Sequence, residues 1–395
     1  MQSYQKWIWQ DAGWPEMRFS SQALAPVMAR FQQSSGELIG RAHALGFDGI
    51  TPAVAEAWIA EAISTSAIEG EGLNPNSVRS SVARRLGLEL SNGSPAARNI
   101  EGLLDLIADA SNNFEAPLTL DRLCSWHSAL FPTGLSGMHR IDVGVMRTSE
   151  ESMQIVSGPI GRQKVHFQAP AAKDLPKEMD RFLQWLNGSR SQGIARVAIA
   201  HLWFETIHPF DDGNGRIGRA IIQLCLAQEV GPVAKMMTLA RQLELERNAY
   251  YLQLEAAQKA VNLDVTPWVQ WFLNQVEHAC NHANLVIDSS LQRMRFLAQT
   301  AEVPLNDRQR KILKKLLDAG PGGFKGGMTT RKYASVCEVH KITAARDLIN
   351  LAELGVLKSE GAGRSTRYYP NIDGWEELFV ENEGASDATS DAPSA

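Results

Sequence analysis

The chain has 395 residues, 44% of them apolar and 21% charged, so it is long enough for two or three domains and too apolar to be largely disordered. Its net charge of −5 does not by itself favour a nucleic-acid or membrane surface. The four cysteines form no CxxC pair, no run is apolar enough for a membrane span, and the first residues lack a signal-peptide pattern. These features predict a cytoplasmic protein with reduced thiols and no membrane partner.

Residues 1–110 are expected to form a helical N-terminal region, because apolar residues recur there at helical spacing. Within it, PAVAEAWIAEAISTSAIEG predicts a helix over about 52–69. Pro52 suits the first turn of that helix, and Gly70 suits its end.

Residues 111–280 are expected to form a larger helical domain, interrupted once by strand-like sequence at 153–170, MQIVSGPIGRQKVHFQAP. Two short alternating runs flank Gly158 and Gly161 and predict a β-hairpin. A lone hairpin does not complete a sheet, so one of its edges is expected to be open.

The stretch HPFDDGNGRIGR, residues 208–219, lies between two helical runs. Glycines at the start of the second helix let backbone N–H groups face an anion, which the helix dipole also favours. Arg216 and Arg219 are three residues apart and suit a polyphosphate. Asp212 is unfavourable there unless a cation such as Mg²⁺ joins it to the phosphate oxygens. His208, with a free ring nitrogen, is a candidate base for an attacking hydroxyl.

A zinc or iron site is an alternative use of the same region. His201, Glu205 and His208 fall on one helical face and carry side chains that bind metals. A di-iron site, however, needs a second Glu-x-x-His pair, which the sequence lacks. His201 is therefore expected to be a packed helix residue.

Residues 281–303 are expected to be a connecting helix or linker, and residues 304–372 form a basic segment. Between 304 and 370 there are 13 Lys/Arg and 6 Asp/Glu, which gives this piece +7 and leaves −12 on the rest of the chain. The segment resembles a winged helix-turn-helix, with Thr329 or Thr330 capping one helix, 341–354 as the recognition helix and 361–369 as the wing. Such a module binds DNA or docks a protein, and both readings stay open. Residues 373–395 are expected to be largely disordered.

HPFDDGNGRIGR matches the Fic-family signature, HPFx(D/E)GNGRxxR, at every defined position, so the chain resembles Fic-domain protein adenylyltransferases. The resemblance implies a mainly α fold: a Fic helical bundle with a β-hairpin flap, followed here by the winged helix. It also implies transfer of AMP from ATP, with Mg²⁺, to a Ser, Thr or Tyr hydroxyl of a target protein or of the chain itself. His208 would be the base, Asp212 would hold Mg²⁺, and Arg216 and Arg219 would contact the β- and γ-phosphates. The phosphate site would be completed by Gly213, Asn214, Gly215, Ile217 and Gly218, whereas Asp211 falls at the variable position.

Residues 65–70, TSAIEG, are similar to the inhibitory motif (S/T)xxxE(G/N) of many Fic proteins. The resemblance implies that Glu69, in a motif that begins at Thr65, pairs with Arg219 and occupies the partner of the γ-phosphate. An acid at the end of a helix also needs a partner, because the helix dipole disfavours it there. Enzymes with this glutamate can also remove AMP, and the sequence leaves that balance open.

Two further expectations rest on the resemblance alone. The stretch ERNAYYLQLEAAQ resembles the lining of the family's adenine pocket, which makes Tyr250 and Gln258 candidate adenine contacts. The hairpin at 153–170 resembles the family's docking flap, where a target segment would add as a strand. The family also implies a homodimer. Flap residues expected near the nucleotide are Gln163, Lys164, Val165 and His166.

Two other functions compete with AMP transfer. The first is a nucleotide-sensing DNA-binding regulator, which would have no need of the base His208. The second is a Doc-like protein kinase, whose relatives depart from the GNGR pattern that this chain keeps at Gly213 and Gly215. The target protein and the type of hydroxyl modified are not indicated by the sequence.

Overall fold

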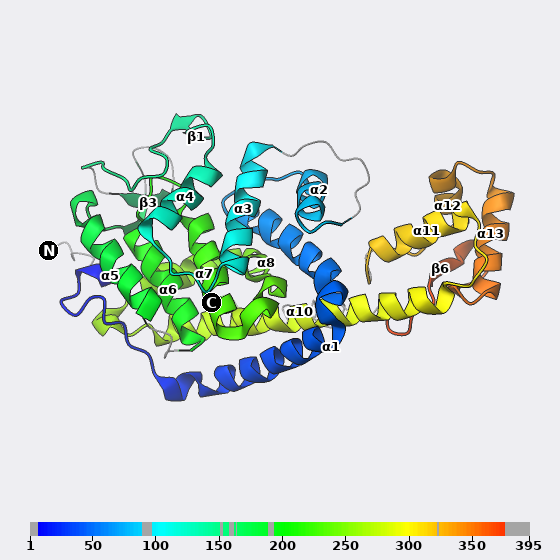
Figure 1. Ribbon diagram of the computed structural model, residues 1–395, viewed down its shortest axis with the longest axis horizontal. Coiled ribbons are helices and arrows are strands. Elements are labelled where there is room, and N and C mark those ends of the chain that lie inside the picture. Colours follow the sequence, from blue (N-terminus) through cyan, green and yellow to red (C-terminus); the bar gives the residue numbers. More distant parts are fainter. Residues whose placement is uncertain are drawn as a thin grey trace, which may run out of the picture. The chain divides into compact units, whose positions relative to one another are not determined.

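The computed structural model describes residues 7–88, 97–150, 153–157, 162, 164–188, 193–321 and 324–375, and helices dominate it as predicted (Figure 1). The chain divides into two compact units, Met1–Asn284 and Leu285–Ala395. The division falls inside the predicted connecting segment 281–303. That segment is largely helical, because α10 (Thr266–Thr300) continues through it.

The N-terminal region of the first unit is built on one long helix, α1 (Ser21–Ile68), preceded by the short η1 (Ile8–Gln10). The Ser20 hydroxyl caps α1 by accepting from the Ala23 N–H. Gly46 has non-helical angles, φ 68° and ψ 173°, and kinks the helix. The helix predicted at 52–69 therefore begins earlier, just after this break, and ends where predicted, at Gly70 with φ 82°. Helices α2 (Pro75–Arg85) and α3 (Arg98–Asn112) follow.

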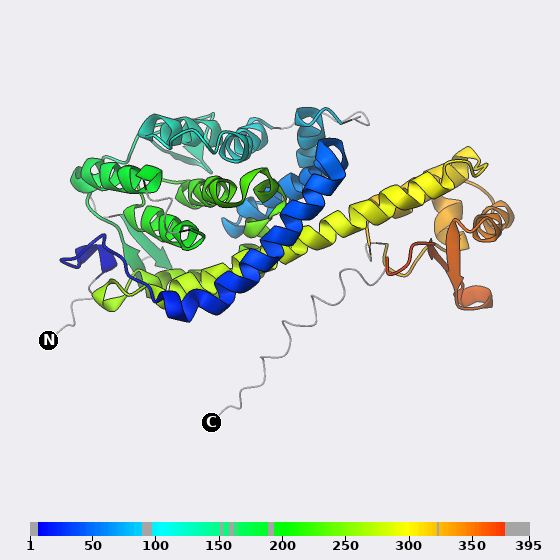
Figure 2. The ribbon, with the colours of Figure 1, turned by 60° about the horizontal axis from the view of Figure 1, so that its bottom comes forward.

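The centre of this unit is the helix pair α6 (Ala195–Ile207) and α7 (Asn214–Val230), which the other helices cover (Figure 2). Every residue of α6 is buried, which explains why its sequence is apolar on all sides. Surrounding elements are α4 (Leu120–Leu130), η2 (Ala172–Asp174), α5 (Leu175–Gly188), η4 (Gly231–Met236), α8 (Leu239–Leu245), α9 (Arg247–Ala257) and η5 (Val261–Leu263).

The predicted hairpin is present as β3 (Gln154–Ser157) and β4 (Lys164–Gln168), an antiparallel pair with an irregularity between Ile155 and Val156. Its turn at 158–161 lies outside the described residues. A second, smaller hairpin, β1 (Leu135–Ser136) with β2 (His139–Arg140), was not predicted because two-residue strands leave no alternating pattern. Each sheet in the described part of the chain has two strands.

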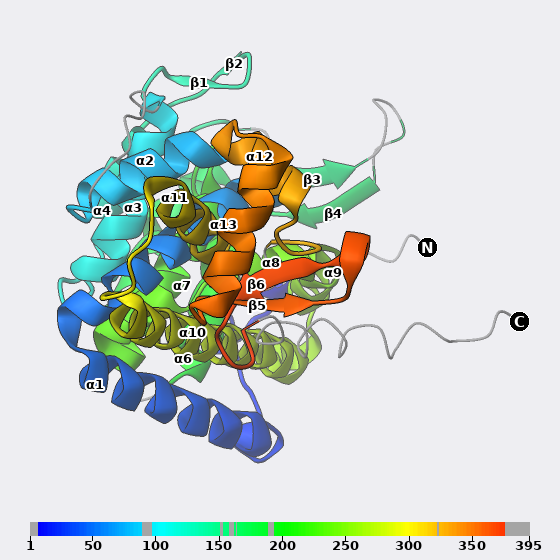
Figure 3. The same cartoon turned by 90° about the vertical axis from the view of Figure 1, so that its right-hand side faces the viewer.

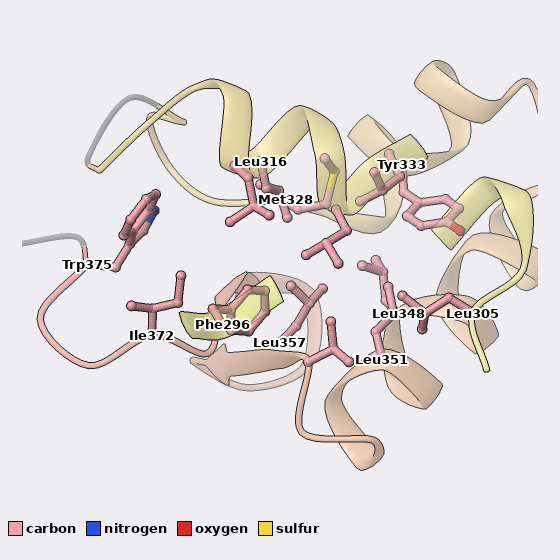
Figure 4. Packing of buried hydrophobic residues seen from close by; sticks show 14 of the residues in the cluster. Phe296, Leu305, Leu316, Met328, Tyr333, Leu348, Leu351, Leu357, Ile372 and Trp375 are labelled. Atoms are coloured by element: carbon pink, nitrogen blue, oxygen red, sulfur yellow. The ribbon is translucent and has the colours of Figure 1, made fainter. Parts of the chain in front are cut away.

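The second unit has the element order predicted for a winged helix-turn-helix (Figure 3): α11 (Asp307–Asp318), α12 (Thr330–Cys337), α13 (Lys341–Glu353), β5 (Leu357–Glu360), η6 (Gly363–Ser365) and β6 (Arg367–Pro370). Thr329, one of the two predicted caps, accepts from the Lys332 N–H at the start of α12. The unit has its own apolar core, which includes Phe296, Tyr333, Leu348 and Trp375 (Figure 4).

Two further predictions concern the C-terminal tail and the absence of a membrane span. The tail expected to be disordered lies outside the described residues from 376 onward. Within the described residues, no helix is both long and apolar enough to span a bilayer.

Candidate functional site

The residues of the HPFDDGNGRIGR stretch form a tight junction between α6 and α7. His208 ends α6 in the left-handed conformation, φ 50° and ψ 62°, which is uncommon for a residue other than glycine. Gly213 precedes α7 with φ 79°, and a Cβ there would lie 2.8 Å from the Phe131 ring. The junction therefore needs glycine at 213 both for its backbone angles and for space.

Side chains from inside and outside the signature fix the loop between these two residues. Asn214 donates to the Phe210 carbonyl at 2.8 Å and accepts from the Phe210 N–H at 3.0 Å, so its amide closes the loop. Phe210 is fully buried and stacks on His127, with ring centroids 4.4 Å apart. The His127 Nδ1 accepts from the Gly144 N–H at 2.9 Å, which leaves its proton on Nε2, 3.1 Å from the Asp212 carbonyl. Burial lowers the pKa of His127 and keeps this ring neutral.

The two arginines of the signature lie on the first turns of α7 and are nearly buried, Arg216 at 7% and Arg219 at 2% exposure. Arg219 donates from Nε to the Thr65 hydroxyl at 2.6 Å, and from Nη2 to Glu69 Oε1 at 2.6 Å and the Thr65 carbonyl at 3.0 Å. The predicted pairing of Glu69 with Arg219 is therefore present. A methyl group at Gly215 would overlap the Glu69 carboxylate, so this carboxylate sits directly against the start of α7.

A second acid from the end of α1 was missed by the sequence analysis. Glu71 Oε2 accepts from Arg216 Nη1 at 3.1 Å, two residues beyond Glu69 in the chain. Arg216 also lies over the Phe131 ring, 4.9 Å from its centroid. Both arginines that would hold phosphates are therefore occupied by carboxylates of one segment. The only feature of the sequence that could have indicated Glu71 is its position in Gly-Glu-Gly, residues 70–72, at the end of the inhibitory motif.

His208, Glu205 and Glu61 are buried, and their pKa values are shifted from the ordinary values. Burial lowers the pKa of His208 to about 4, so its imidazole is uncharged at neutral pH. Burial raises the pKa of Glu205 to about 8, although the Arg219 charge opposes this. Glu61, one turn before Thr65 on α1, has its pKa raised by burial to about 7 and accepts from the Ala240 N–H at 3.1 Å. At neutral pH, His208 is thus an uncharged base, whose pKa is also lowered by the charge of the buried Arg147.

His201 has the packing role that the sequence analysis favoured. Its Nε2 lies 2.8 Å from the Tyr250 hydroxyl, and burial lowers its pKa to about 3. The His208 Nδ1 is 3.9 Å from Glu205 Oε2. In the described part of the chain, no three His, Cys, Asp or Glu side chains converge as metal ligands.

The two adenine candidates are both buried. Tyr250 is 1% exposed and bonded to His201, and Gln258 is 2% exposed and donates to the Glu205 carbonyl at 3.3 Å. A contact of either side chain with adenine stays a prediction. The neighbouring Tyr251 is 42% exposed and donates to the Ile68 carbonyl at 3.3 Å.

The flap residues are only partly covered by the structure, because Gln163 lies outside the described residues. Lys164 is exposed on β4, and Val165 pairs in register with Val156. The His166 Nδ1 lies 2.8 Å from Glu255 Oε2 and ties the flap to α9. A contact of these residues with a nucleotide stays a prediction.

The two carboxylates of the signature have different surroundings. Asp212 Oδ1 accepts from the Gly213 N–H at 2.5 Å, and its Oδ2 accepts from the Ser136 hydroxyl on the unpredicted β1 hairpin. Asp211, expected to be a bystander, accepts from the Asp142 N–H at 3.2 Å and so anchors the same loop region. Asp212 therefore lies between the small hairpin and the start of α7.

A neutral buried histidine at the end of one helix, an amide-rich turn at the start of the next, and a β-hairpin beside them define the class of Fic-fold proteins. A solved Fic family protein from Desulfovibrio desulfuricans G20 has this fold: it is 21% identical, with a TM-score of 0.52 over 89% of this chain and 97% of its own.

Residues 117–226 match the family model described as Fic/DOC family, so this chain carries a Fic/DOC-family domain. Residues 7–88 match a domain of unknown function, DUF4172. The chain is 31% identical over 152 residues to "Protein adenylyltransferase Fic" of Drosophila yakuba, covering 37% of this chain and 29% of that protein. It is 32% identical over 127 residues to "Uridine 5'-monophosphate transferase" of Xanthomonas campestris pv. campestris (strain 8004), covering 30% of this chain and 23% of that protein. The chain thus spans less than a third of the length of both relatives.

Proposed function

We propose that this protein is a protein adenylyltransferase, which transfers AMP from ATP to a Ser, Thr or Tyr hydroxyl, and that Glu69 holds it inactive. The observation that carries the proposal is the occupation of Arg219 by Glu69 beside a neutral His208. A buried guanidinium at a helix start is a strong site for phosphate, and a carboxylate is the anion that mimics it.

The chemistry follows from the positions of these groups. The neutral imidazole of His208 accepts the proton of the target hydroxyl as its oxygen attacks the α-phosphorus of ATP. The bond to the β-phosphate oxygen breaks, and pyrophosphate leaves. Arg216, Arg219 and the first N–H groups of α7 stabilise the charge on the β- and γ-phosphates.

The residues around Asp212 fit the proposed Mg²⁺. Magnesium usually binds one or two carboxylates together with substrate phosphates and water, rather than a cage of protein ligands. Asp212 supplies one such carboxylate at the edge of the phosphate site, where it is bonded to the Gly213 N–H and the Ser136 hydroxyl. When bound, the ion would offset the repulsion between this carboxylate and the phosphates.

The nucleotide is proposed to be ATP, with UTP as the specific competitor. The relatives named above are an adenylyltransferase and a uridine monophosphate transferase, and both are matched at similar identity. The residues of the proposed phosphate site would contact only the phosphates and not the base, so this site is compatible with either nucleotide.

The target protein is proposed to dock on the β3–β4 flap. Ile155 and Val156 of β3 are 38% and 39% exposed, so two adjacent apolar side chains of this strand are available to a docking segment. An added strand would pair with the open edge of the hairpin and bring its hydroxyl toward His208. A homodimer also remains a proposal, to be checked by light scattering.

Labelled nucleotides test the proposed activity in the full chain carrying Glu69→Gly. Label from the α-phosphate of ATP is expected on protein, with the His208→Ala variant at least about a hundredfold slower. Label from the γ-phosphate would instead identify a kinase, and α-labelled UTP would identify uridylyl transfer. An absence of all three labels would overturn the proposal in favour of nucleotide sensing. Incubation of labelled product with the unsubstituted chain measures AMP removal.

A nucleotide-sensing DNA-binding regulator is the second candidate function, favoured by the +7 segment and by the exposed cations Lys341 and Arg346 on α13. Binding of duplex DNA by the full chain should weaken steeply as salt rises, and Arg346→Ala should weaken it further. Lys314→Ala, an exposed cation on α11, is the control. DNA binding that is absent, or insensitive to Arg346→Ala, would leave this surface to a protein partner.

A further inference from the structure

A buried arginine outside the signature contacts the loop that carries His208. Arg147 is 3% exposed and lies between the two hairpins of the first unit. Its Nε donates to the His208 carbonyl at 2.9 Å, and its Nη2 donates to the carbonyls of Pro170 at 2.6 Å and Ile207 at 3.4 Å. Its backbone N–H donates to the Pro209 carbonyl at 2.9 Å. One residue thus binds three successive carbonyls at the end of α6.

These contacts act on a strained part of the backbone. The left-handed region is unfavourable for a residue other than glycine, so His208 keeps this conformation only if its surroundings hold it there. The last carbonyls of a helix have no partner within the helix, and a cation is favourable at that end. The planar fork of Arg147 satisfies both needs at once, which a lysine does only in part.

The same side chain connects the hairpin to the histidine. Pro170 lies two residues beyond the end of β4, and its carbonyl shares the Arg147 Nη2 with Ile207. A displacement of the base of the flap is therefore passed to the His208 backbone through a single guanidinium group. Burial lowers the pKa of Arg147, although the Asp211 charge opposes this.

We infer that Arg147 is a positioning residue for the transfer reaction: it fixes His208 in its reactive conformation and couples that conformation to the base of the flap. The inference rests on the proposed function. It separates nucleotide binding from catalysis, because the phosphate site at the start of α7 makes no contact with Arg147 among the hydrogen bonds of the described residues.

The experiment uses the full chain in a Glu69→Gly background, with Arg147→Met and Arg147→Lys. In Arg147→Met, kcat is expected to fall about a hundredfold, the size of effect seen when a reacting group is misplaced by about 1 Å. The KM for ATP should change less than threefold, and Arg147→Lys should recover part of the loss in kcat.

Arg122→Met is the matched control. Arg122 also donates to carbonyls at the end of a helix, those of Asp109 and Asn113 at 3.2 and 3.1 Å, but it does not contact the 208–219 loop through a described hydrogen bond. Its loss should lower thermal stability and leave kcat within twofold. An equal fall of kcat in Arg122→Met, or an unchanged kcat in Arg147→Met, overturns the inference.

A second measurement does not depend on activity. The pKa of His208, followed by NMR of its ring, is lowered by burial and by the Arg147 charge. Arg147→Lys keeps the charge and therefore isolates the effect of the loop: in this variant the pKa should rise toward its ordinary value as the loop opens, and it should stay low in Arg122→Met. If the Glu69→Gly parent transfers no nucleotide, the proposed function fails, while this titration still decides whether Arg147 holds the loop. Where Arg147→Met does not fold, Arg147→Lys decides by the same two measurements, and an unshifted His208 in that variant overturns the inference.

Discussion

At the scale of single residues, Arg219 binds the Glu69 carboxylate in this structure and is the proposed partner of the γ-phosphate. Its guanidinium is nearly buried and bonded to both Thr65 and Glu69. An unpaired cation at this depth would be costly, so the resting protein needs an anion there. The γ-phosphate of a nucleotide is a second anion for the same fork. In the proposed function, inhibition by Glu69 and binding of the γ-phosphate therefore compete for the same guanidinium atoms of Arg219.

The Glu69→Gly variant is expected to label itself or its target about ten- to a hundredfold faster, because a charge-assisted hydrogen bond of about 1.5–3 kcal/mol no longer has to be displaced. Glu71→Ala should give a smaller rise, of at most about fivefold, since Glu71 is 46% exposed and its pair with Arg216 is screened by solvent. Initial rates of label incorporation measure both.

Glu56→Ala is the control for these two variants. Glu56 lies on α1, the helix that Glu69 caps, but it forms an exposed ion pair with Arg79 of α2, away from the signature. A rise in Glu56→Ala equal to that in Glu69→Gly would mean that loosening of α1, and not the freed arginine, causes activation.

The buried titratable groups predict how stability varies with pH. Folded-state pKa values of about 3, 4 and 4 at His201, His208 and His282 mean that the unfolded chain binds more protons there below pH 6.5, so stability falls as the pH drops toward 4. Values of about 7 and 8 at Glu61 and Glu205 mean that the folded chain holds extra protons, so stability also falls as the pH rises toward 8.

Glu205→Gln should therefore reduce the loss of stability between pH 6.5 and 8, where Glu205 holds its proton in the folded chain but not in the unfolded one, by up to about 1.4 kcal/mol per pH unit. Denaturant unfolding at a series of pH values measures the slope. Glu56→Gln should leave it unchanged, and an unchanged slope in Glu205→Gln would contradict the assignment of a protonated carboxyl.

The helix–loop–helix geometry of residues 208–219 was predictable because glycine positions and helix starts specify it locally. The chemical roles of these residues stay predictions. The burial of Tyr250 and Gln258 was not predictable, because helical spacing shows that residues share a helix and not which of its faces is buried. Arg147, His127 and Ser136 were missed because their link to the loop is made only by the tertiary fold.

At the scale of elements, α7 is bounded by Gly213 and Gly231, which differ in what surrounds them. Gly213 at its start has φ 79° and faces the Phe131 ring, whereas Gly231 at its end has φ 74° and open space around the Cβ position. Both positions disfavour a side chain for reasons of backbone conformation. Only the first also shapes the site.

Gly213→Ala is expected to abolish labelling, because the added methyl group must move either the loop or Phe131. Gly231→Ala should cost about 1–3 kcal/mol of stability through backbone strain and leave labelling of the folded protein unchanged. Thermal unfolding and label incorporation, measured on the same samples, separate the two effects. Retained labelling in Gly213→Ala would show that the junction tolerates another backbone path.

The helices, the main hairpin and the cap at Thr329 were predictable because each leaves a local signal: a period, a turn cluster or a capping residue. The length of α1 was not predictable. Pro52 was expected in the first turn of a helix, but the helical segment begins earlier and the break in helical angles is at Gly46, since proline is tolerated near the start of a helical segment.

At the scale of the whole molecule, the division between the two units falls at Asn284 and Leu285, inside α10 and before the composition shift near residue 300. The second unit has its own buried cluster. The sequence indicated the basic segment through its charge, and it left open whether residues 281–303 form a connecting helix or a linker. Helix α10 continues through most of them.

Leu348→Ala, which removes a fully buried side chain of the second unit, should destabilise that unit by about 2–5 kcal/mol and leave nucleotide transfer by the first unit unchanged. Calorimetry should show one transition moving and a second staying in place. Movement of both transitions together would show that the two cores unfold as one.

The burial of α1 bears on how the proposed inhibition by Glu69 is relieved. Leu24, Phe31, Trp58 and Ile68 of this helix belong to the hydrophobic core, and Glu69 caps its end. Proteolytic removal of the whole helix would therefore expose the core of the unit. In the proposed function, activation is instead expected to be a small, reversible withdrawal of the last turn of α1, so that each molecule keeps Glu69 for the return to the inactive state.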